Sequence, residues 1–402
     1  MYFCTDFKDT VICSKMQRKT LVRILSVLLF IVSFSAIAQE EHGMDVKEVA
    51  PGETGSKTKK EEIKEFINHH LLDSHSFNLF GSTNEETGET HHYGFPLPVI
   101  IWDDGLHTFM SSEFHHGEEV VESEGKYFTL HHEKIYRTDA EGTLNYDADH
   151  GDHPTNVRPL DFSITKSVIM MLVVGLLLIW LFRSLAKSYA TNGSIPKGMG
   201  RFFEPIVLYI RDDIAIANIG ENKYKKYMPF LLTVFFFIWF LNMFGLTPLG
   251  VNVTGNIAVT TALALIVFLI TTFTGTKDYW KHIFDPLGDG MPWAGKILIY
   301  IILVPIEILG LFIKPFALLI RLYANMTAGH VVLMSLVGLI FIFKSWIGGP
   351  LSFGLSFAIS LIELLVALLQ AYIFTMLAAL YFGFASETHA EHEAHEGEIQ
   401  HL

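Results

Sequence analysis

A few charged and amide side chains interrupt two long apolar segments near the C-terminal end of this chain. They are Glu307, Lys314, Arg321, Asn325, His330, Glu363 and Gln370. A charged residue at membrane depth costs ~3 kcal/mol or more, so such residues face protein or water and usually serve a function. Arg321 lies 25 residues from Lys296 and 25 from Trp346, too far for its guanidinium to reach the membrane surface. This arginine stays charged at physiological pH.

The spacing of these residues predicts two pairs across a helical hairpin. An antiparallel pairing that turns near residue 346, beside Gly348-Gly349-Pro350, places Arg321 opposite Gln370 and His330 opposite Glu363. We therefore expect a buried Arg321–Gln370 contact and a separate His330–Glu363 pair ~10 to 14 Å away along the helices. A histidine–carboxylate pair suits proton relay because imidazole titrates near neutrality. A single fixed arginine is instead a permanent positive barrier.

Five apolar segments can carry these residues across a membrane. About 20 apolar residues cross a bilayer as a helix, and 50 consecutive residues between Lys226 and Lys277 have no charged side chain. We predict an all-α polytopic membrane protein whose last two helices are long and tilted, because 34 helical residues extend ~50 Å against a ~30 Å hydrocarbon core. The predicted spans are 163–182, 228–247, 257–275, 296–343 and 351–384. An interfacial amphipathic helix is predicted from Phe202, Phe203, Ile206, Val207 and Ile210.

The N-terminus has the pattern of an export signal. Basic residues from Lys15 to Arg23 precede the apolar run 24–37, and Ala36-Ile37-Ala38 forms a small-x-small cleavage site. A first transmembrane helix is the alternative interpretation, and Met16 is an alternative start. Both cysteines precede the cleavage site, so we expect no disulfide or thiolate metal site in the mature chain.

The charges between the spans predict the orientation. Eight basic side chains lie between Arg183 and Lys226, and positive charge belongs on the cytoplasmic side. We therefore expect a protein of the bacterial inner membrane with a periplasmic mature N-terminus and a cytoplasmic C-terminus. The expected regions are a signal peptide at 1–38, an exported polar segment at 39–160, a membrane domain at 161–386 and a polar tail at 387–402.

The segment 39–160 is acidic and holds 13 of the 19 histidines. Runs of β-type residues at 95–110 and 126–137, with turns at Asp103-Asp104-Gly105 and Glu124-Gly125, predict a small antiparallel hairpin unit. A metal site is an alternative, but the histidine spacing is irregular and HxxxH and HExxH are absent, so a polar surface without metal is favoured. The net charge of −13 argues against a nucleic-acid partner.

The residues around Arg321 resemble a known family. The stretches Leu319–His330 and Leu369–Phe374, with Lys314-Pro315 and Asn252-Val253-Thr254, are similar to subunit a of the F-type ATP synthase over roughly residues 160–388. The resemblance implies the stator half of a rotary proton channel, packed in the lipid bilayer against a ring of c subunits. It also implies a b-subunit peripheral stalk, indirect contact with the catalytic F1 sector, and neither a cofactor nor an active site of its own.

The resemblance further implies a role for each matched residue. Arg321 would be the essential arginine that faces the rotor carboxylate, with Gln370 as its partner, and Glu307 would lie in the inner half-channel. The outer half-channel would be lined by Asn242, Asn256, Asn325, His330 and Glu363.

Two positions depart from the family pattern. Many bacterial members carry Glu where His330 stands and His where Glu363 stands, so the pair looks exchanged. Gly245 occupies a place often held by Asp. The polar N-terminal segment is also much longer than is usual.

Two other classes of membrane protein are alternatives for this chain. A secondary ion-coupled transporter would also need charges within the membrane, but such proteins commonly show internal repeats, and none is visible here. An intramembrane hydrolase would need a metal triad or a Ser/His arrangement, and neither HExxH nor GxSxG occurs.

Overall fold

The computed structural model describes residues 72–83, 90–117, 119–146, 154–192, 198–247, 251–285, 293–342 and 348–387. The predicted signal peptide, the charged lead-in after it and nearly all of the polar C-terminal tail lie outside these residues.

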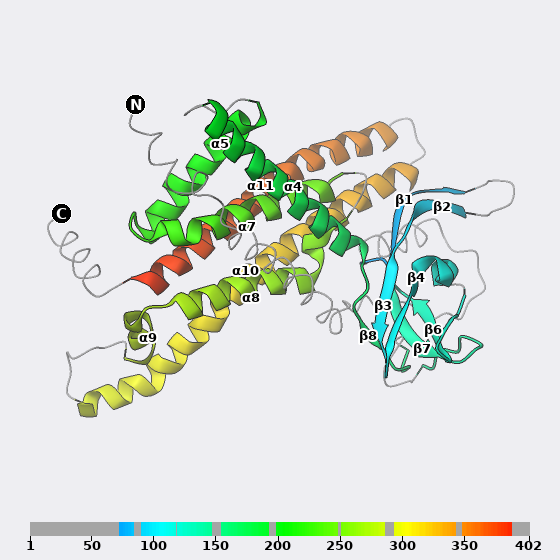
Figure 1. The fold of residues 1–402 in the computed structure, drawn as a ribbon, viewed down its shortest axis with the longest axis horizontal. Coiled ribbons are helices and arrows are strands. Elements are labelled where there is room, and N and C mark those ends of the chain that lie inside the picture. The colour runs from blue at the N-terminus through cyan, green and yellow to red at the C-terminus, as the bar shows by residue number, and fades with distance from the viewer. Residues whose placement is uncertain are drawn as a thin grey trace.

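Residues 72–161, here called the β domain, form three small antiparallel sheets (Figure 1). Strand β1 (Ser76–Thr83) pairs with β2 (Thr90–Pro96), and β3 (Pro98–Trp102) lies between β4 (Leu106–Met110) and β8 (Leu160–Asp161). Strand β6 (Lys126–His131) lies between β5 (Val121–Ser123) and β7 (Lys134–Thr138), and the short helix η1 (Ser111–Gly117) follows β4. The predicted hairpins are therefore confirmed, whereas β1 was not predicted.

Turn chemistry explains two of these hairpins. Glu124 and Gly125 have positive φ, as a two-residue type I′ turn requires, and they join the paired residues Ser123 and Lys126. The β6–β7 turn is built the same way from His132 (φ 47°) and Glu133 (φ 60°), neither of which is glycine. Left-handed backbone costs such residues roughly 1–2 kcal/mol each.

The helices of the membrane domain follow directly after β8. They are α4 (Lys166–Asn192), α5 (Met199–Tyr209), the π-helix η2 (Ile210–Ile216), α6 (Ala217–Ile219), α7 (Tyr224–Gly245), η3 (Val253–Gly255), α8 (Ile257–Thr274), α9 (Lys277–Phe284), α10 (Trp293–Ile342) and α11 (Gly348–Ser386). Five helices in the described part of the chain are long and apolar enough to cross a membrane: α4, α7, α8, α10 and α11. The predicted polytopic helical architecture is confirmed.

Two element predictions need adjustment. The first span begins and ends later than residues 163–182, because Ser163 is tied to the β domain by accepting a hydrogen bond from the Ile100 N–H (3.0 Å). The predicted amphipathic helix exists as α5, but Phe203 and Val207 are buried in the helical core, while Phe202 is 64% exposed. Much of the α5 face that was expected to lie on lipid therefore packs on neighbouring helices.

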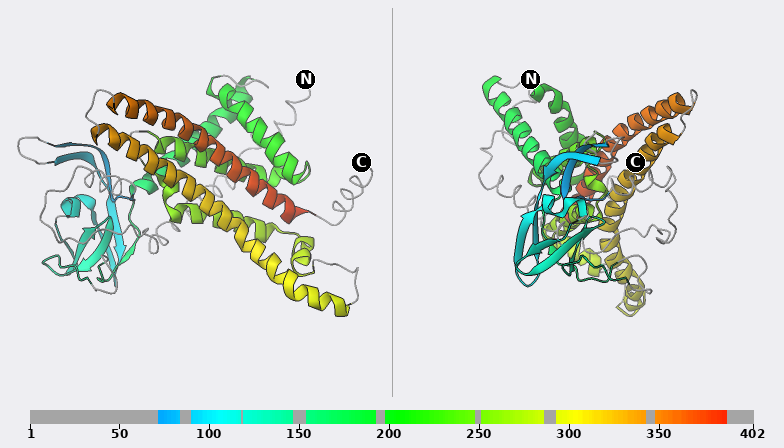
Figure 2. Two further views of the ribbon diagram at one scale, coloured as in Figure 1. Left: turned by 180° about the vertical axis from the view of Figure 1, so that it is seen from behind. Right: turned by 90° about the vertical axis from the view of Figure 1, so that its right-hand side faces the viewer.

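The long helices α10 and α11 run side by side as an antiparallel pair (Figure 2). With 50 and 39 residues, they extend ~75 Å and ~58 Å, well beyond a ~30 Å hydrocarbon core. Only 6% of the most apolar window of α10 is buried within the chain, against 61% for α7. Helix α7 is therefore central to the bundle, whereas α10 presents a long apolar face that the described residues leave uncovered.

Candidate functional site

The centre of the site lies where α7, α10 and α11 meet. Glu363 of α11 is buried, and its carboxylate packs so closely on Gly329 of α10 that a Cβ there would lie 2.0 Å from Glu363 Oε1. His330 is also buried, and its Nε2 lies 3.2 Å from where a Cβ on Gly245 of α7 would stand. Two glycines thus admit two titratable side chains between packed helices, as small residues do in membrane bundles.

Gln370 is hydrogen-bonded to Asn325, and among the described residues it has no hydrogen bond to its predicted partner Arg321. Gln370 is buried and accepts a hydrogen bond from Asn325 Nδ2 (2.9 Å), one helical turn beyond Arg321. Arg321 and Asn325 are exposed, and among the described residues Arg321 makes no hydrogen bond or ion pair. At Gln370 the partner on α10 lies one turn from the predicted one, because Asn325 and not Arg321 donates to its amide oxygen.

Beyond this centre, a polar group lies around η3. The buried side chain of Asn242 on α7 accepts a hydrogen bond from Thr254 Oγ1 (2.6 Å). Its Nδ2 has no hydrogen-bond partner among the described residues. Asn256 caps α8 by accepting from the Ala258 N–H (3.0 Å). Because Asn242 precedes Gly245 by one turn on α7, this group lies on the same side of α7 as the His330 contact.

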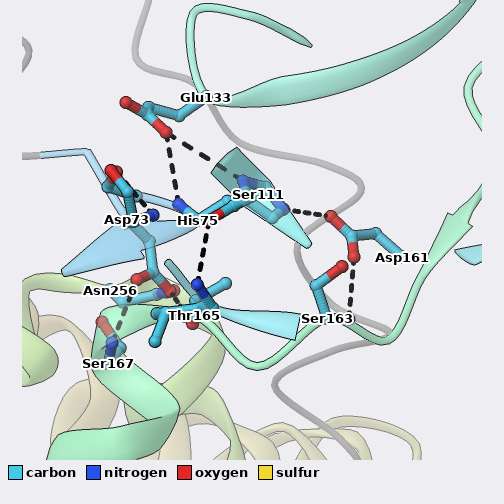
Figure 3. Close-up of polar contacts among 12 residues, drawn as sticks. Asp73, His75, Ser111, Glu133, Asp161, Ser163, Thr165, Ser167 and Asn256 are labelled. Atoms are coloured by element: carbon cyan, nitrogen blue, oxygen red, sulfur yellow. Dashed lines mark hydrogen bonds and ion pairs between the residues drawn. The ribbon is translucent and has the colours of Figure 1, made fainter. Parts of the chain in front are cut away.

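Asn256 also connects the membrane domain to the β domain (Figure 3). Its Nδ2 donates to Asp73 Oδ2 (3.3 Å), which also accepts from Thr165 Oγ1 (2.9 Å), while Asp73 Oδ1 accepts from the Ser167 N–H (3.2 Å). Asp73 therefore satisfies one of the free N–H groups in the first turn of α4. Burial raises the pKa of Asp73 above its ordinary value of 3.8, although Lys166 and the donated hydrogen bonds act in the opposite direction.

His75, two residues after Asp73, is 2% exposed and lies among carboxylates. Its Nε2 is 2.7 Å from Asp161 Oδ2, and its Nδ1 is 4.0 Å from Glu133 Oε2. Burial lowers the pKa of His75, but the hydrogen bond to Asp161 and the charges of Asp161, Glu133 and Asp73 outweigh it, so the pKa is raised above 6.5. Burial acts to raise the pKa of Asp161, yet the contact with His75 leaves it below 3.8.

A separate group lies towards the opposite ends of α8 and α10. Lys314 Nζ lies over the rings of Tyr381 (5.8 Å) and Phe384 (5.7 Å) on α11, beside a small pocket that Tyr279 of α9 also lines. Burial, together with the negative charge of Glu307, raises the pKa of Tyr279 above 10.0. Glu307 precedes Lys314 by about two turns on α10, so it lies in a different part of the helix from His330 and from Gly329, on which Glu363 packs.

Comparison with known proteins identifies this arrangement. A family model described as ATP synthase A chain matches residues 168–383, more than half of the sequence. The chain belongs to the ATP synthase A chain family.

Relatives of this family support the assignment. The chain is 47% identical over 249 residues to ATP synthase subunit a 2 of Prosthecochloris aestuarii, covering 60% of this chain and 73% of the relative. It is 40% identical over 332 residues to ATP synthase subunit a of Chlorobium phaeobacteroides, covering 79% of this chain and 91% of the relative. ATP synthase subunit a of Myxococcus xanthus is 45% identical over 247 residues, 59% of this chain and 77% of the relative.

The β domain has a match of its own. A model described as "Domain of unknown function (DUF8433)" matches residues 66–162. The chain therefore combines the membrane domain of its family with a second recognisable unit, and Asp73 and Asn256 are hydrogen-bonded between the two.

The structure brings together most of the polar residues predicted for this chain. Asn325 of α10 and Gln370 of α11 are hydrogen-bonded, and Glu363 of α11 packs on Gly329, the residue of α10 before His330. Sequence reasoning missed three other features: the glycine contacts of His330 and Glu363, Tyr279 near Glu307, and the residues Asp73 and His75. Asp73 is 183 residues from Asn256 in the sequence, so no local pattern could have revealed this contact.

Proposed function

We propose that this chain is the stator part of the proton channel of an F-type ATP synthase. Its two half-channels would load and unload carboxylates of a c-subunit ring, and thus couple proton flow to rotation and ATP synthesis. The observation that carries the proposal is Arg321, a permanent charge on the exposed apolar face of α10. A charge there costs ~3 kcal/mol or more in lipid, so this face calls for a protein partner with acidic groups.

Covering this face with a rotor of c subunits meets that requirement. A carboxylate on the ring would lie near Arg321, whose positive charge favours its ionised form and thus the release of its proton. The same charge blocks direct proton flow between the half-channels. Asn325 and Gln370, hydrogen-bonded to each other beside Arg321, provide neutral polar groups at the same level.

The two polar groups of the structure support this proposal, one for each half-channel. The outer one would run from Asn256 and Asn242 to His330 and Glu363, where a buried imidazole and a buried carboxylate can exchange protons. The inner one would open beside Glu307, near Tyr279 and the pocket that Lys314 lines. A proton entering through the outer half-channel would neutralise a ring carboxylate, travel with the ring through lipid, and leave on the Glu307 side.

The surroundings of the chain follow from the same reasoning. It would lie in the bacterial inner membrane with the β domain in the periplasm and the C-terminus in the cytoplasm. A b-subunit stalk would hold it, and contact with the F1 sector would be indirect. It would have no active site of its own. A secondary ion-coupled transporter is not favoured, since the chain belongs to a different family.

The direct test is Arg321→Ala in membrane vesicles that contain the complete complex. We expect ATP-driven proton uptake to be abolished, while ATP hydrolysis by the F1 sector persists and the c ring still copurifies. The matched control is Arg201→Ala, because Arg201 is an exposed arginine of α5 outside the five candidate spans. Normal pumping by the Arg321→Ala variant would overturn the proposal.

A further inference from the structure

The β domain carries a buried histidine and three partly buried carboxylates that the channel described above does not use. Asp73, His75, Glu133 and Asp161 gather where β1, the β6–β7 turn and β8 approach the first turns of α4 and α8 (Figure 3). No three His, Cys, Asp or Glu side chains within the described ranges form a group suited to a metal ion. A network of exchangeable protons, and not a metal centre, is the chemistry that these side chains share.

His75 is the most buried of these four groups. The side chain of Asp161 is 19% exposed and that of Glu133 is 9% exposed, whereas that of His75 is 2% exposed. Asp73 is partly buried. The Nδ1 atom of His75 is buried and makes no hydrogen bond to any described residue, although Glu133 Oε2 lies 4.0 Å away. A buried ring nitrogen without a hydrogen-bond partner, beside carboxylates, is a group that can take up or release a proton.

The position of Glu133 in this group requires a strained backbone conformation. Glu133 lies in a left-handed conformation (φ 60°) that glycine would adopt more easily. Its carboxylate nevertheless accepts a hydrogen bond from the His75 N–H (3.3 Å). Glycine at this turn would remove the strain together with the carboxylate, so the turn keeps an acidic group next to His75.

From Asp73, polar side chains continue into the membrane domain. Asp73 accepts a hydrogen bond from Asn256. Thr254, two residues before Asn256 in the sequence, donates a hydrogen bond to Asn242 on α7. Asn242 carries a buried Nδ2 that has no hydrogen-bond partner in the described part of the chain. One turn further along α7, Gly245 contacts the ring of His330. Polar groups therefore extend from the surface of the β domain to the centre of the proposed outer half-channel.

We propose that the β domain supplies the entrance of the outer half-channel, with His75 and Asp73 as its first proton-carrying side chains. A proton taken up at His75 passes to the carboxylate of Asp73, and the neutral Asp73 then releases it towards Asn256 and returns to its charged form. Asp161, Glu133 and Lys166 are the other charged groups facing these two residues. This proposal rests on the proposed function, since it adds two residues to the same channel.

The test measures ATP synthesis by the complete complex in proteoliposomes at a fixed membrane potential, with the pH of the outer-channel side varied. Asp73→Asn keeps an acceptor oxygen for the Ser167 N–H but cannot carry a proton. We expect a loss of about tenfold or more near pH 8, within the range that positioned acid–base groups contribute, and a smaller loss near pH 6 where protons are abundant. His75→Gln should show the same pH-dependent loss, and Asp73→Glu should restore part of the rate.

A control variant separates proton transfer from structural support. His107→Gln removes an equally buried histidine of the β domain, bonded to Ser123 and the Asp103 carbonyl. It should leave the pH profile unchanged in shape. The proposal is overturned if Asp73→Asn and His75→Gln match this control at every pH. If Arg321→Ala couples normally in the same vesicles, it is the proposed function that fails.

Discussion

Gly329→Ala moves the Glu363 carboxylate while leaving every titratable group in place. The new Cβ would lie 2.0 Å from Glu363 Oε1 and 2.3 Å from its Cδ. Ordinary van der Waals contact begins near 3.4 Å, so the carboxylate must retreat by about 1.4 Å. The obstructing atoms are the end of a flexible side chain, so the helix can persist, and alanine favours helix over glycine by roughly 1 kcal/mol.

A displacement of this size has a large effect if Glu363 transfers protons. A misplacement of about 1 Å can reduce a reaction that depends on geometry by ~10²-fold. We expect ATP-driven proton uptake in inverted vesicles to fall at least tenfold, with normal amounts of assembled complex. The matched control is Gly310→Ala on the same helix, where a Cβ meets nothing within 4 Å in this chain. The double variant Gly329→Ala/Glu363→Asp, whose side chain is one methylene shorter, should recover part of the rate.

The results that would refute this reasoning are specific. Proton uptake at the wild-type rate in Gly329→Ala would show that the position of the Glu363 carboxylate is not important for transport. A loss that the shorter Asp at position 363 fails to relieve would place the damage in the packing of α10 and not in the carboxylate.

Three further predictions concern stability, measured by thermal unfolding of the full chain in detergent. Thr254→Val should destabilise by ~1–3 kcal/mol, because the buried Asn242 Oδ1 loses its hydrogen bond; an unchanged melting temperature would contradict this. Gly125→Ala should cost roughly 1–2 kcal/mol because its φ is +79°, with Gly105→Ala, free of that strain, near neutral as control. The pKa of His75 in the folded protein is raised above 6.5, so the protonated ring stabilises the fold, and this stabilisation is fully present below pH 6.5. It is lost as the pH rises through the folded-state pKa. The stability difference between wild type and His75→Gln should accordingly shrink at alkaline pH, and a growing difference would refute the sign.

The hairpin of α10 and α11 shows how far spacing arguments reach. Close to the link, pairing by residue number is right to within one residue, since Glu363 packs on Gly329 where His330 was expected. Farther from the link it errs by a full turn, and Gln370 meets Asn325 in place of Arg321. An error that grows with distance is expected when two helices cross at an angle, because pairing by number treats them as parallel rods.

Predictions that depend only on neighbouring residues agree with the structure. The length of an apolar run and the φ values that a turn demands are properties of neighbouring residues, so the spans and the Glu124-Gly125 turn were predictable. The contacts of Asp73 depend instead on how the β domain docks on α4 and α8. Docking is fixed by the complementary surfaces of whole elements, which a single sequence does not display.

The histidine at position 330 and the glycine at position 245 are sterically linked. In this structure the ring of His330 fills the space beside Gly245, where even a Cβ would lie 3.2 Å from Nε2 and 3.3 Å from the Val251 carbonyl oxygen. An aspartate at 245 and a histidine at 330 would therefore compete for one volume between α7 and α10. A glycine at 245 leaves that volume to the imidazole, and Gly329 gives Glu363 matching room on the other side of α10. A histidine at position 330 thus requires a small residue at position 245, and a glutamate at position 363 requires one at position 329.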